Sequence, residues 1–262
     1  MYIQMIETKL VQKFGNSSHV VLPKEYIGRR IKFVTEPKTF QDIKSEILEI
    51  LKPYLENIVG IYLYGSYVRN EQTVESDIDL LVITSNKLKM IENIKDYHIV
   101  STTIKGIENT IKNNAILILP IIKEAKTIIN PDPLLMYKDY KFTKNNTKQF
   151  LDDTKKILEL NKKGLELDFE VGSLVYSLML RIRGLLMIKL MLNYVLYSKT
   201  LLLNYFENNN FEKDKINALY IIYTNERKSI HVKESNVITK EDIEKLLSIA
   251  EKLLKEVSRL LK

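Results

Sequence analysis

A change in hydrophobic periodicity near residue 140 constrains the fold of this chain more than any other feature. Before it, residues 38–137 alternate between amphipathic helical segments and short apolar runs of strand type. From Phe142 onward, apolar residues recur only at helical spacing, in segments 149–168, 172–193, 199–207, 215–227 and 239–261. This order predicts an α+β protein in which a sheet domain precedes a C-terminal helical bundle.

Individual elements follow from local patterns. Residues 39–55 predict an amphipathic helix with Ile43, Ile47, Leu48 and Leu51 at helical spacing. Apolar runs at 58–65, 77–84 and 98–103 predict strands. The segments 87–97 and 105–125 predict helices, the second one bent or broken at Pro120.

The last helix has a predicted start and a predicted buried face. Thr239 is the expected N-cap, and Asp242 stands where a capping box has Glu or Gln. Its apolar face comprises Ile243, Leu246, Leu247, Ala250, Leu253 and Leu254.

The N-terminal 37 residues have a different pattern, with short β-like runs at 9–14, 19–23 and 29–34. Gly15 and Asn16 favour a tight turn between the first two runs, so we predict a β-hairpin that ends at Pro37. The predicted domains are therefore residues 1–37, 38–137 and 138–262.

Composition excludes several classes of protein. The absence of cysteine excludes disulfides, thiolate zinc sites and cysteine nucleophiles, and it is compatible with the cytoplasm, where we expect the protein. Lys and Arg number 40 against 33 Asp and Glu, and this net charge of +7 suits phosphate-bearing partners. The most apolar stretch, residues 171–205, carries Arg181, Arg183, Lys189 and Lys199, so we expect a buried helix there and no membrane partner.

Residues 65–82, GSYVRNEQTVESDIDLLV, contain the pattern that points to chemistry. Gly65 and Ser66 follow an apolar strand and predict a helix start, whose N–H groups attract anions. Asp77 and Asp79 lie two residues apart at the start of a strand, so both carboxylates project from one face. Paired carboxylates are costly beside a core unless a cation binds them, which suggests Mg²⁺ and a phosphate substrate. The alternative is a Gly-Ser turn followed by exposed aspartates at a sheet edge.

This stretch resembles the signature of the DNA polymerase beta-like nucleotidyltransferase superfamily, most closely its small prokaryotic minimal group. Val68 and Asn70 replace the Ala and Gly that the group usually has, whereas the other signature positions match: Gly65, Ser66, Arg69, Ser76, Asp77 and Asp79. The resemblance covers about residues 38–137 and implies a mixed sheet. It also implies Mg²⁺-dependent transfer of a nucleoside monophosphate from an NTP, expected to be ATP, to a hydroxyl acceptor, with release of pyrophosphate.

The resemblance also implies roles for individual residues. Gly65 and Ser66 would hold the β- and γ-phosphates, and Arg69 would neutralise the triphosphate. Asp77 and Asp79 would be the catalytic residues and the Mg²⁺ ligands. The family usually supplies a third carboxylate from a later strand, but residues 97–102 contain no acid. Asp96 and His98 are the alternatives for that place, while Glu124 is expected to be merely solvated.

Residues 8–35 resemble an AbrB-like swapped hairpin, through Lys13-Phe14-Gly15-Asn16-Ser17 and Leu22-Pro23-Lys24. The resemblance implies a homodimer, and DNA binding through basic residues that outnumber Glu7 and Glu25: Lys9, Lys13, Lys24, Arg29, Arg30 and Lys32. The alternative is a β-extension packed on its own transferase domain.

Residues 216–254 resemble HEPN and kanamycin-nucleotidyltransferase helical domains. Only three residues separate Arg227 from His231, fewer than the Arg-x4–6-His pattern of HEPN ribonucleases, so we expect no such nuclease. Arg181, Arg183, Tyr220 and Tyr223 could contact a nucleotide or form core. The sequence thus predicts an antitoxin-like nucleotidyltransferase acting on a partner protein, a small molecule or an RNA end. The alternative function is a DNA-binding regulator with an inactive, nucleotide-sensing transferase fold.

Overall fold

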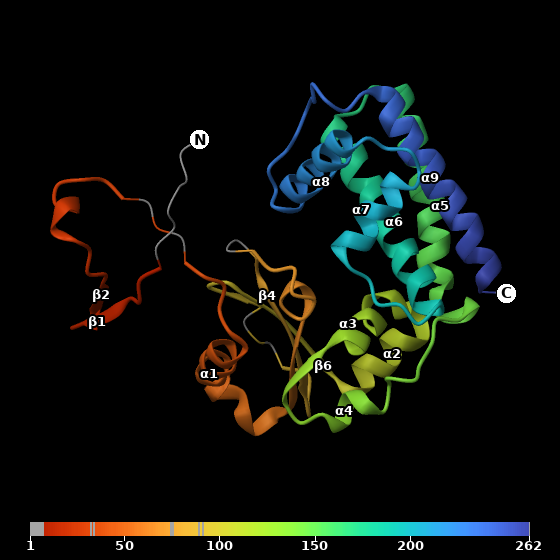
Figure 1. The fold of residues 1–262 in the computed structure, drawn as a ribbon. Coiled ribbons are helices and arrows are strands. Elements are labelled where there is room, and N and C mark those ends of the chain that lie inside the picture. The colour runs from red at the N-terminus through yellow and green to blue at the C-terminus, as the bar shows by residue number, and fades with distance from the viewer. Residues whose placement is uncertain are drawn as a thin grey trace. The chain divides into compact units, whose positions relative to one another are not determined.

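The structure, a computed structural model, describes residues 8–31, 33, 35–73, 76–88, 90 and 92–261 (Figure 1). Glu7 and Lys32, which entered the charge argument for the N-terminal hairpin, lie outside these residues. The chain divides into two compact units, residues 1–36 and residues 37–262.

The first unit is a small hairpin. Strands β1 (Gln12–Phe14) and β2 (Ser17–His19) pair antiparallel, with Phe14 opposite Ser17. Gly15, the first residue of the turn, has a φ of +58°, which glycine adopts without strain. The 3-10 turn η1 (Lys24–Tyr26) follows, and the described residues of the segment 29–34 form no strand, contrary to the prediction. Every described residue from 8 to 36 is exposed except Leu22, so this part of the chain buries no core of its own.

The second unit begins with a mixed sheet, as predicted. Its order is β5-β6-β4-β3-β7, formed by β3 (Ile58–Tyr64), β4 (Ile78–Thr84), β5 (Asn93–Ile94), β6 (Tyr97–Thr103) and β7 (Lys126–Ile129). β4 and β6 are parallel, and the other neighbouring pairs are antiparallel.

Helices cover both faces of this sheet (Figure 1). Helix α1 (Phe40–Leu51), continued by the 3-10 turn η2 (Lys52–Asn57), packs on the face that includes Leu80 and Val82. Helices α2 (Ile104–Asn114) and α3 (Leu119–Glu124), joined by η4 (Ala115–Leu117), pack on the face that includes Leu81 and Ile83. Alternate residues of one strand therefore belong to two cores, and the second core continues into the helical bundle.

Two segments differ from the sequence-based expectation. The helix predicted at 87–97 is wrong, because its described residues form a loop and β5, which pairs with β6. Met90 and Ile94 pack into the α1-side core from this loop, so their apolar character reflects burial by an edge strand. Strand β7 was not predicted. It is four residues long and directly follows α3, too short for a clear alternating pattern.

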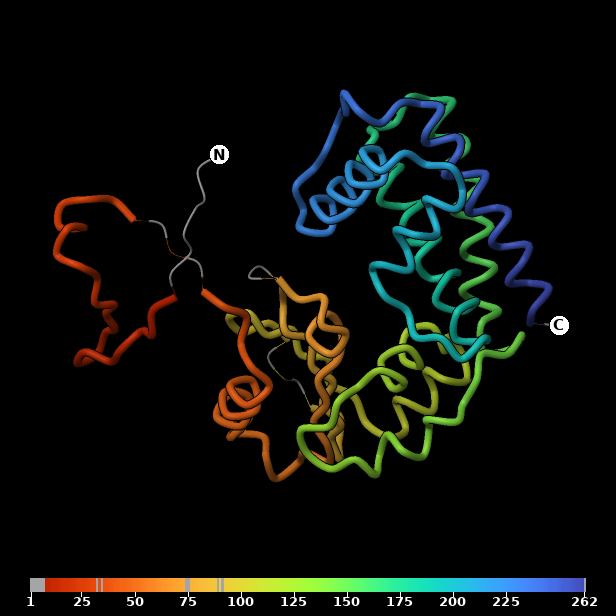
Figure 2. Tube along the Cα trace, in the orientation of Figure 1, coloured from red at the N-terminus to blue at the C-terminus, as the bar shows by residue number. Residues whose placement is uncertain are grey.

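The C-terminal half is helical, as predicted. After the short helix α4 (Asp132–Leu135) come α5 (Lys144–Glu166), α6 (Val171–Leu192), α7 (Lys199–Glu207), α8 (Lys213–Arg227) and α9 (Lys240–Leu260). α6 packs against α5, α8 and α9, and the trace shows α9 running alongside α5 (Figure 2). Among the described helices, α6 alone is long and apolar enough to cross a membrane. Its ten buried residues nevertheless place it inside the bundle, where the predicted buried helix was expected.

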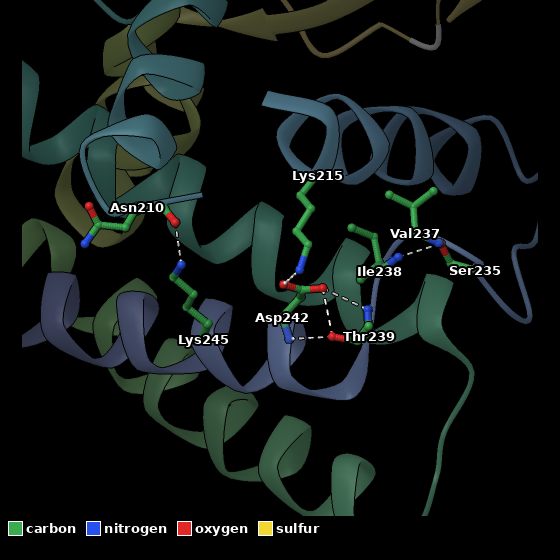
Figure 3. A network of polar contacts seen from close by, with 8 residues as sticks. All are labelled: Asn210, Lys215, Ser235, Val237, Ile238, Thr239, Asp242 and Lys245. Carbon is green, nitrogen blue, oxygen red and sulfur yellow. Dashed lines mark hydrogen bonds and ion pairs between the residues drawn. The ribbon is translucent and has the colours of Figure 1, made fainter. Parts of the chain in front are cut away.

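The start of α9 confirms the predicted capping box (Figure 3). The Asp242 carboxylate accepts a hydrogen bond from the Thr239 backbone N–H at 2.9 Å, and the Thr239 hydroxyl accepts one from the Asp242 N–H. Lys215 of α8 donates to the same carboxylate at 2.7 Å. One side chain therefore caps α9 and ties it to α8. The predicted apolar face of α9 is buried throughout.

Candidate active site

The predicted catalytic residue Asp79 lies at one end of the sheet, where β3, β4 and β6 are neighbours. β3 ends at Tyr64, whose register partner in β4 is Asp79. In the parallel pairing of β4 and β6, Asp79 lies beside His98. Because side chains of paired residues share a face, Asp79 and His98 point to the same side of the sheet.

A cavity of about 150 Å³ opens at this end of the sheet. Both predicted carboxylates line it: Asp79 comes from β4, and Asp77 directly precedes that strand. The other lining residues come from the β5–β6 region and from the end of α8: Asn93, Lys95, Asp96, Tyr97, His98 and Arg227. We refer to it as the Asp77/Asp79 cavity.

The carboxylate of Asp79 is the more buried of the pair, with 18% of its side chain exposed. Burial raises the pKa of Asp79, Arg227 and His98 oppose this rise, and the charge of Asp77 adds to it. A carboxylate that is desolvated and faces a like charge is stabilised when a cation binds. The burial of Asp79 and its closeness to Asp77 therefore favour a cation at this pair, and Arg227 offsets part of that effect.

His98 lies on β6, the strand on which the family resemblance predicted a third carboxylate. Its Nδ1 lies 3.4 Å from Oδ1 of Asp79. Asp96 also lines the cavity, but its carboxylate pairs with Lys38 at 2.9 Å. The strand after the aspartate pair thus supplies a histidine nitrogen beside Asp79, and the alternative candidate is neutralised by a lysine.

The prediction of a helix that starts at Gly65 is wrong, because the chain forms only the 3-10 turn η3 (Gly65–Tyr67) there. We call these three residues the Gly65 turn. Gly65 has a φ of +80°, and a Cβ on it would lie 2.3 Å from Oδ2 of Asp79. Only glycine combines this backbone conformation with so close an approach to the carboxylate. Asn70, which replaces the glycine usual in the resembling group, has a φ of +55°, a conformation that asparagine tolerates better than most residues.

Glu124 is not merely solvated, and that expectation is corrected. Its side chain is 10% exposed, and its Oε1 accepts the backbone N–H of Gly65 at 2.9 Å. Its Oε2 accepts a hydrogen bond from Arg69 at 2.7 Å. Arg69 also donates to Glu71 at 2.9 Å. The charged partners that the structure gives Arg69 are therefore the carboxylates of Glu124 and Glu71, and its assignment to the nucleotide stays a prediction.

Sequence reasoning missed the positions of Glu124 and Arg227. Glu124 is a single carboxylate on an apolar helix, a signal that could have indicated a buried polar contact. Arg227 was considered only for its spacing from His231, whereas the structure places it in the Asp77/Asp79 cavity. His231 instead pairs with Glu226 at 3.1 Å and is 70% exposed.

The other candidate nucleotide contacts in the bundle are largely internal. Tyr223 is 4% exposed and accepts a hydrogen bond from Arg183 at 3.2 Å. The guanidinium of Arg183 also lies over the ring of Tyr197, at 5.3 Å. Tyr223 is thus a core residue, and Arg183 is committed to neighbouring tyrosines.

The donor set of the cavity fits a hard divalent cation. No group of three acidic, histidine or cysteine side chains is arranged to hold a metal within the described parts of the chain. Mg²⁺, however, commonly takes one or two carboxylates and completes its coordination with water and substrate phosphates. Asp77 and Asp79 are such a pair.

Comparisons with known proteins agree with this geometry in part. Residues 45–134 match the family model described as Polymerase beta, Nucleotidyltransferase, and residues 3–35 match a model described as a putative transposon-encoded protein (DUF2080). No curated protein matches the chain.

Two solved structures are similar to parts of the chain at low identity. Spectinomycin adenyltransferase AAD(9) from Enterococcus faecialis, crystallised with ATP and spectinomycin, has 13% identity and a TM-score of 0.46, covering 82% of this chain and 99% of its own. A toxin-antitoxin crystallised with AMP-PNP has 17% identity and a TM-score of 0.27, covering 36% of this chain and 80% of its own. The family match contains Gly65, Asp77 and Asp79 together with strands β3 and β4. Residues 45–134 of this chain therefore form a nucleotidyltransferase domain of the polymerase beta type.

Proposed function

We propose that the chain transfers a nucleoside monophosphate from an NTP, ATP first among them, to a hydroxyl acceptor and releases pyrophosphate. The observation that carries this proposal is the Asp77/Asp79 cavity, where two carboxylates meet a histidine from β6 and an arginine from α8. Each kind of group has a role in phosphoryl transfer. The carboxylates would bind a cation, the arginine would neutralise phosphate charge, and the histidine would accept a proton.

Asp77 and Asp79 would hold Mg²⁺. When bound, this ion neutralises phosphate charge and makes the α-phosphorus more open to attack. The Gly65 turn would lie against the phosphates, because a glycine and its neighbour Ser66 let an anion approach the backbone. Arg227 would add positive charge from the helical bundle.

In the proposed reaction, the acceptor oxygen forms a bond to the α-phosphorus while the bond from that phosphorus to the bridging oxygen breaks. Pyrophosphate leaves with the bonding electrons. The proton of the acceptor hydroxyl passes to Nε2 of His98, whose Nδ1 faces Asp79. An Nδ1–H held toward a carboxylate leaves Nε2 as the basic nitrogen, as in other histidine general bases.

The test is transfer from each labelled NTP, with Mg²⁺, to cell extract proteins, small hydroxyl compounds and RNA. We expect the variant Asp77→Asn/Asp79→Asn to stay folded and to lose Mg²⁺-dependent NTP binding. The matched control, Asp152→Asn/Asp214→Asn, removes the same charge from α5 and α8, away from the cavity. Equal NTP affinity in the two double variants, with and without metal, would refute the proposal.

We further propose that residues 1–37 dimerise in the cytoplasm. The supporting observation is their exposed apolar side chains, which include Leu10 at 86%, Ile27 at 81% and Phe33 at 82% exposure. Such a surface needs a partner, and a second copy of the hairpin is the simplest one. Light scattering on a chain beginning at Lys38 should show a monomer, and a dimer as tight as the full-length one would place the interface elsewhere.

The alternative function, a DNA-binding regulator, is favoured by one observation. The described residues of the predicted basic set all lie on this exposed unit: Lys9, Lys13, Lys24, Arg29 and Arg30. Duplex DNA binding that weakens steeply with salt, is lost on removal of residues 1–36, and occurs without any NTP transfer would support the regulator and reject the transferase.

A further inference from the structure

Three buried side chains connect the Gly65 turn to the helical bundle. Glu124, Arg69 and Glu71 are only 10%, 16% and 15% exposed, and Arg69 lies between the two carboxylates. Its guanidinium also lies 5.8 Å from the centre of the Tyr197 ring. A charged group that is buried and paired on both sides is held in one position, because moving it would leave a carboxylate unpaired.

At one end of this group, Glu124 holds the backbone of the Gly65 turn. Its Oε1 accepts the N–H of Gly65 at 2.9 Å, a donor that lies at the start of the 3-10 turn and has no partner within it. Gly65 in turn packs against the carboxylate of Asp79. The position of Glu124 therefore determines how the turn sits against the predicted metal ligand.

At the other end, Glu71 binds the start of α7. Its Oε1 accepts the backbone N–H of Lys199, the first residue of that helix, at 2.5 Å. A carboxylate at a helix N-terminus satisfies a free N–H and interacts favourably with the helix dipole. The chain of contacts thus runs from the bundle, through Glu71, Arg69 and Glu124, to the Gly65 turn.

We propose that Glu124 is a positioning residue for nucleotide binding, and that Arg69 acts through Glu124 instead of contacting the triphosphate. This inference rests on the proposed function, since it concerns the same site. Glu124 holds the Gly65 turn in the orientation that receives phosphates, and Arg69 holds Glu124. The network also makes the orientation of the turn depend on the docking of α7.

The experiment compares the full-length chain with the variants Glu124→Ala, Glu124→Gln and Arg69→Gln and with the double variant Arg69→Gln/Glu124→Ala. ATP affinity with Mg²⁺ is measured by calorimetry, and folding is monitored by circular dichroism during heating. Glu251→Ala, an exposed glutamate on α9, is the matched control. Hydrogen exchange of the peptide containing Gly65 reports on the turn without any nucleotide.

We expect Glu124→Ala to weaken ATP binding by at least about tenfold and to speed exchange at the Gly65 turn, since it removes a hydrogen bond between the Gly65 N–H and a charged carboxylate. Glu124→Gln keeps one oxygen for the Gly65 N–H but turns an NH2 group toward Arg69, so its ATP affinity should fall less than that of Glu124→Ala. The double variant should bind ATP no more weakly than the worse single variant, because two residues that act through one contact are not additive.

Several results would overturn the inference. Additive losses in the double variant would show that Arg69 contacts the nucleotide directly. A lower unfolding temperature with unchanged ATP affinity in Glu124→Ala would show a merely structural role. If the unmodified chain bound no ATP with Mg²⁺, the proposed function would fail and this inference with it, whereas ATP binding that is equal in all variants would reject the inference alone.

Discussion

Replacing Gly65 with alanine tests the geometry of the site more sharply than removing a carboxylate. The substitution leaves every charged group in place and adds one methyl group. At a φ of +80°, a side chain of ordinary handedness costs about 1–2 kcal/mol in backbone strain. The new Cβ would also lie 2.3 Å from Oδ2 of Asp79, and since Cβ contacts shorter than 3.0 Å essentially do not occur, the carboxylate or the turn must move by at least 0.7 Å.

We therefore expect Gly65→Ala to lower the free energy of unfolding by about 1–2 kcal/mol and to weaken Mg²⁺-dependent ATP binding by at least about tenfold. Urea unfolding of the full-length chain measures the first quantity, and calorimetry measures the second. Gly28→Ala is the control, because Gly28 has a similar φ of +78° but no atom within 4 Å of an added Cβ. It carries the backbone strain without the collision and should bind ATP normally.

The outcome that would refute this reasoning is specific. If Gly65→Ala bound ATP and Mg²⁺ as tightly as the unmodified chain, the contact between Gly65 and Asp79 would have no part in the site. If Gly28→Ala weakened binding equally, the loss would come from backbone strain and not from the contact between Gly65 and Asp79.

Three further predictions concern stability and ribonuclease activity. Asp242→Ala should lower the free energy of unfolding by about 1–2 kcal/mol, because it removes the carboxylate half of the α9 capping box as well as a partly buried pair with Lys215, and urea unfolding checks this. Burial opposes a fall in the pKa of Asp242, but hydrogen bonds from Lys215 and Thr239 outweigh burial and lower this pKa in the folded state. The stability that Asp242 contributes should therefore be complete above its unfolded pKa of about 3.9 and be lost as the pH falls through the lower folded pKa. A pH series of unfolding midpoints that shows the same acid dependence in Asp242→Ala would contradict this prediction. Gly184→Val should destabilise the bundle by about 1–3 kcal/mol, since a Cβ there would lie 2.5 Å from the Phe150 ring, and an unchanged melting temperature would show that α5 and α6 can separate freely. Purified protein should not cleave a labelled single-stranded RNA pool without metal, and cleavage that disappears in His231→Ala would show that the nuclease interpretation was right.

Features governed by neighbouring residues were predictable from the sequence. The main helices and strands, the capping box of α9 and its buried face all depend on spacings of a few residues, and the structure confirms them. The two-residue spacing of Asp77 and Asp79 likewise predicted that they lie near each other, and both line the Asp77/Asp79 cavity, although Asp77 directly precedes β4. The family resemblance of the region around them, confirmed by the match over residues 45–134, rests on the same short stretch.

Features governed by distant residues were decided only by the tertiary structure. The pairing with β6 makes β5 a strand where local spacing favoured a helix. Glu124 meets Gly65 across 59 positions of sequence, and Glu71 meets the start of α7 across 128. Arg227 enters the Asp77/Asp79 cavity from the bundle, and no local pattern distinguished it from a surface arginine at a helix end. A spacing of two or four residues determines which face of a strand or helix a side chain occupies. Which residue it contacts there depends on how the sheet and the helices pack, and this packing is a property of the whole fold.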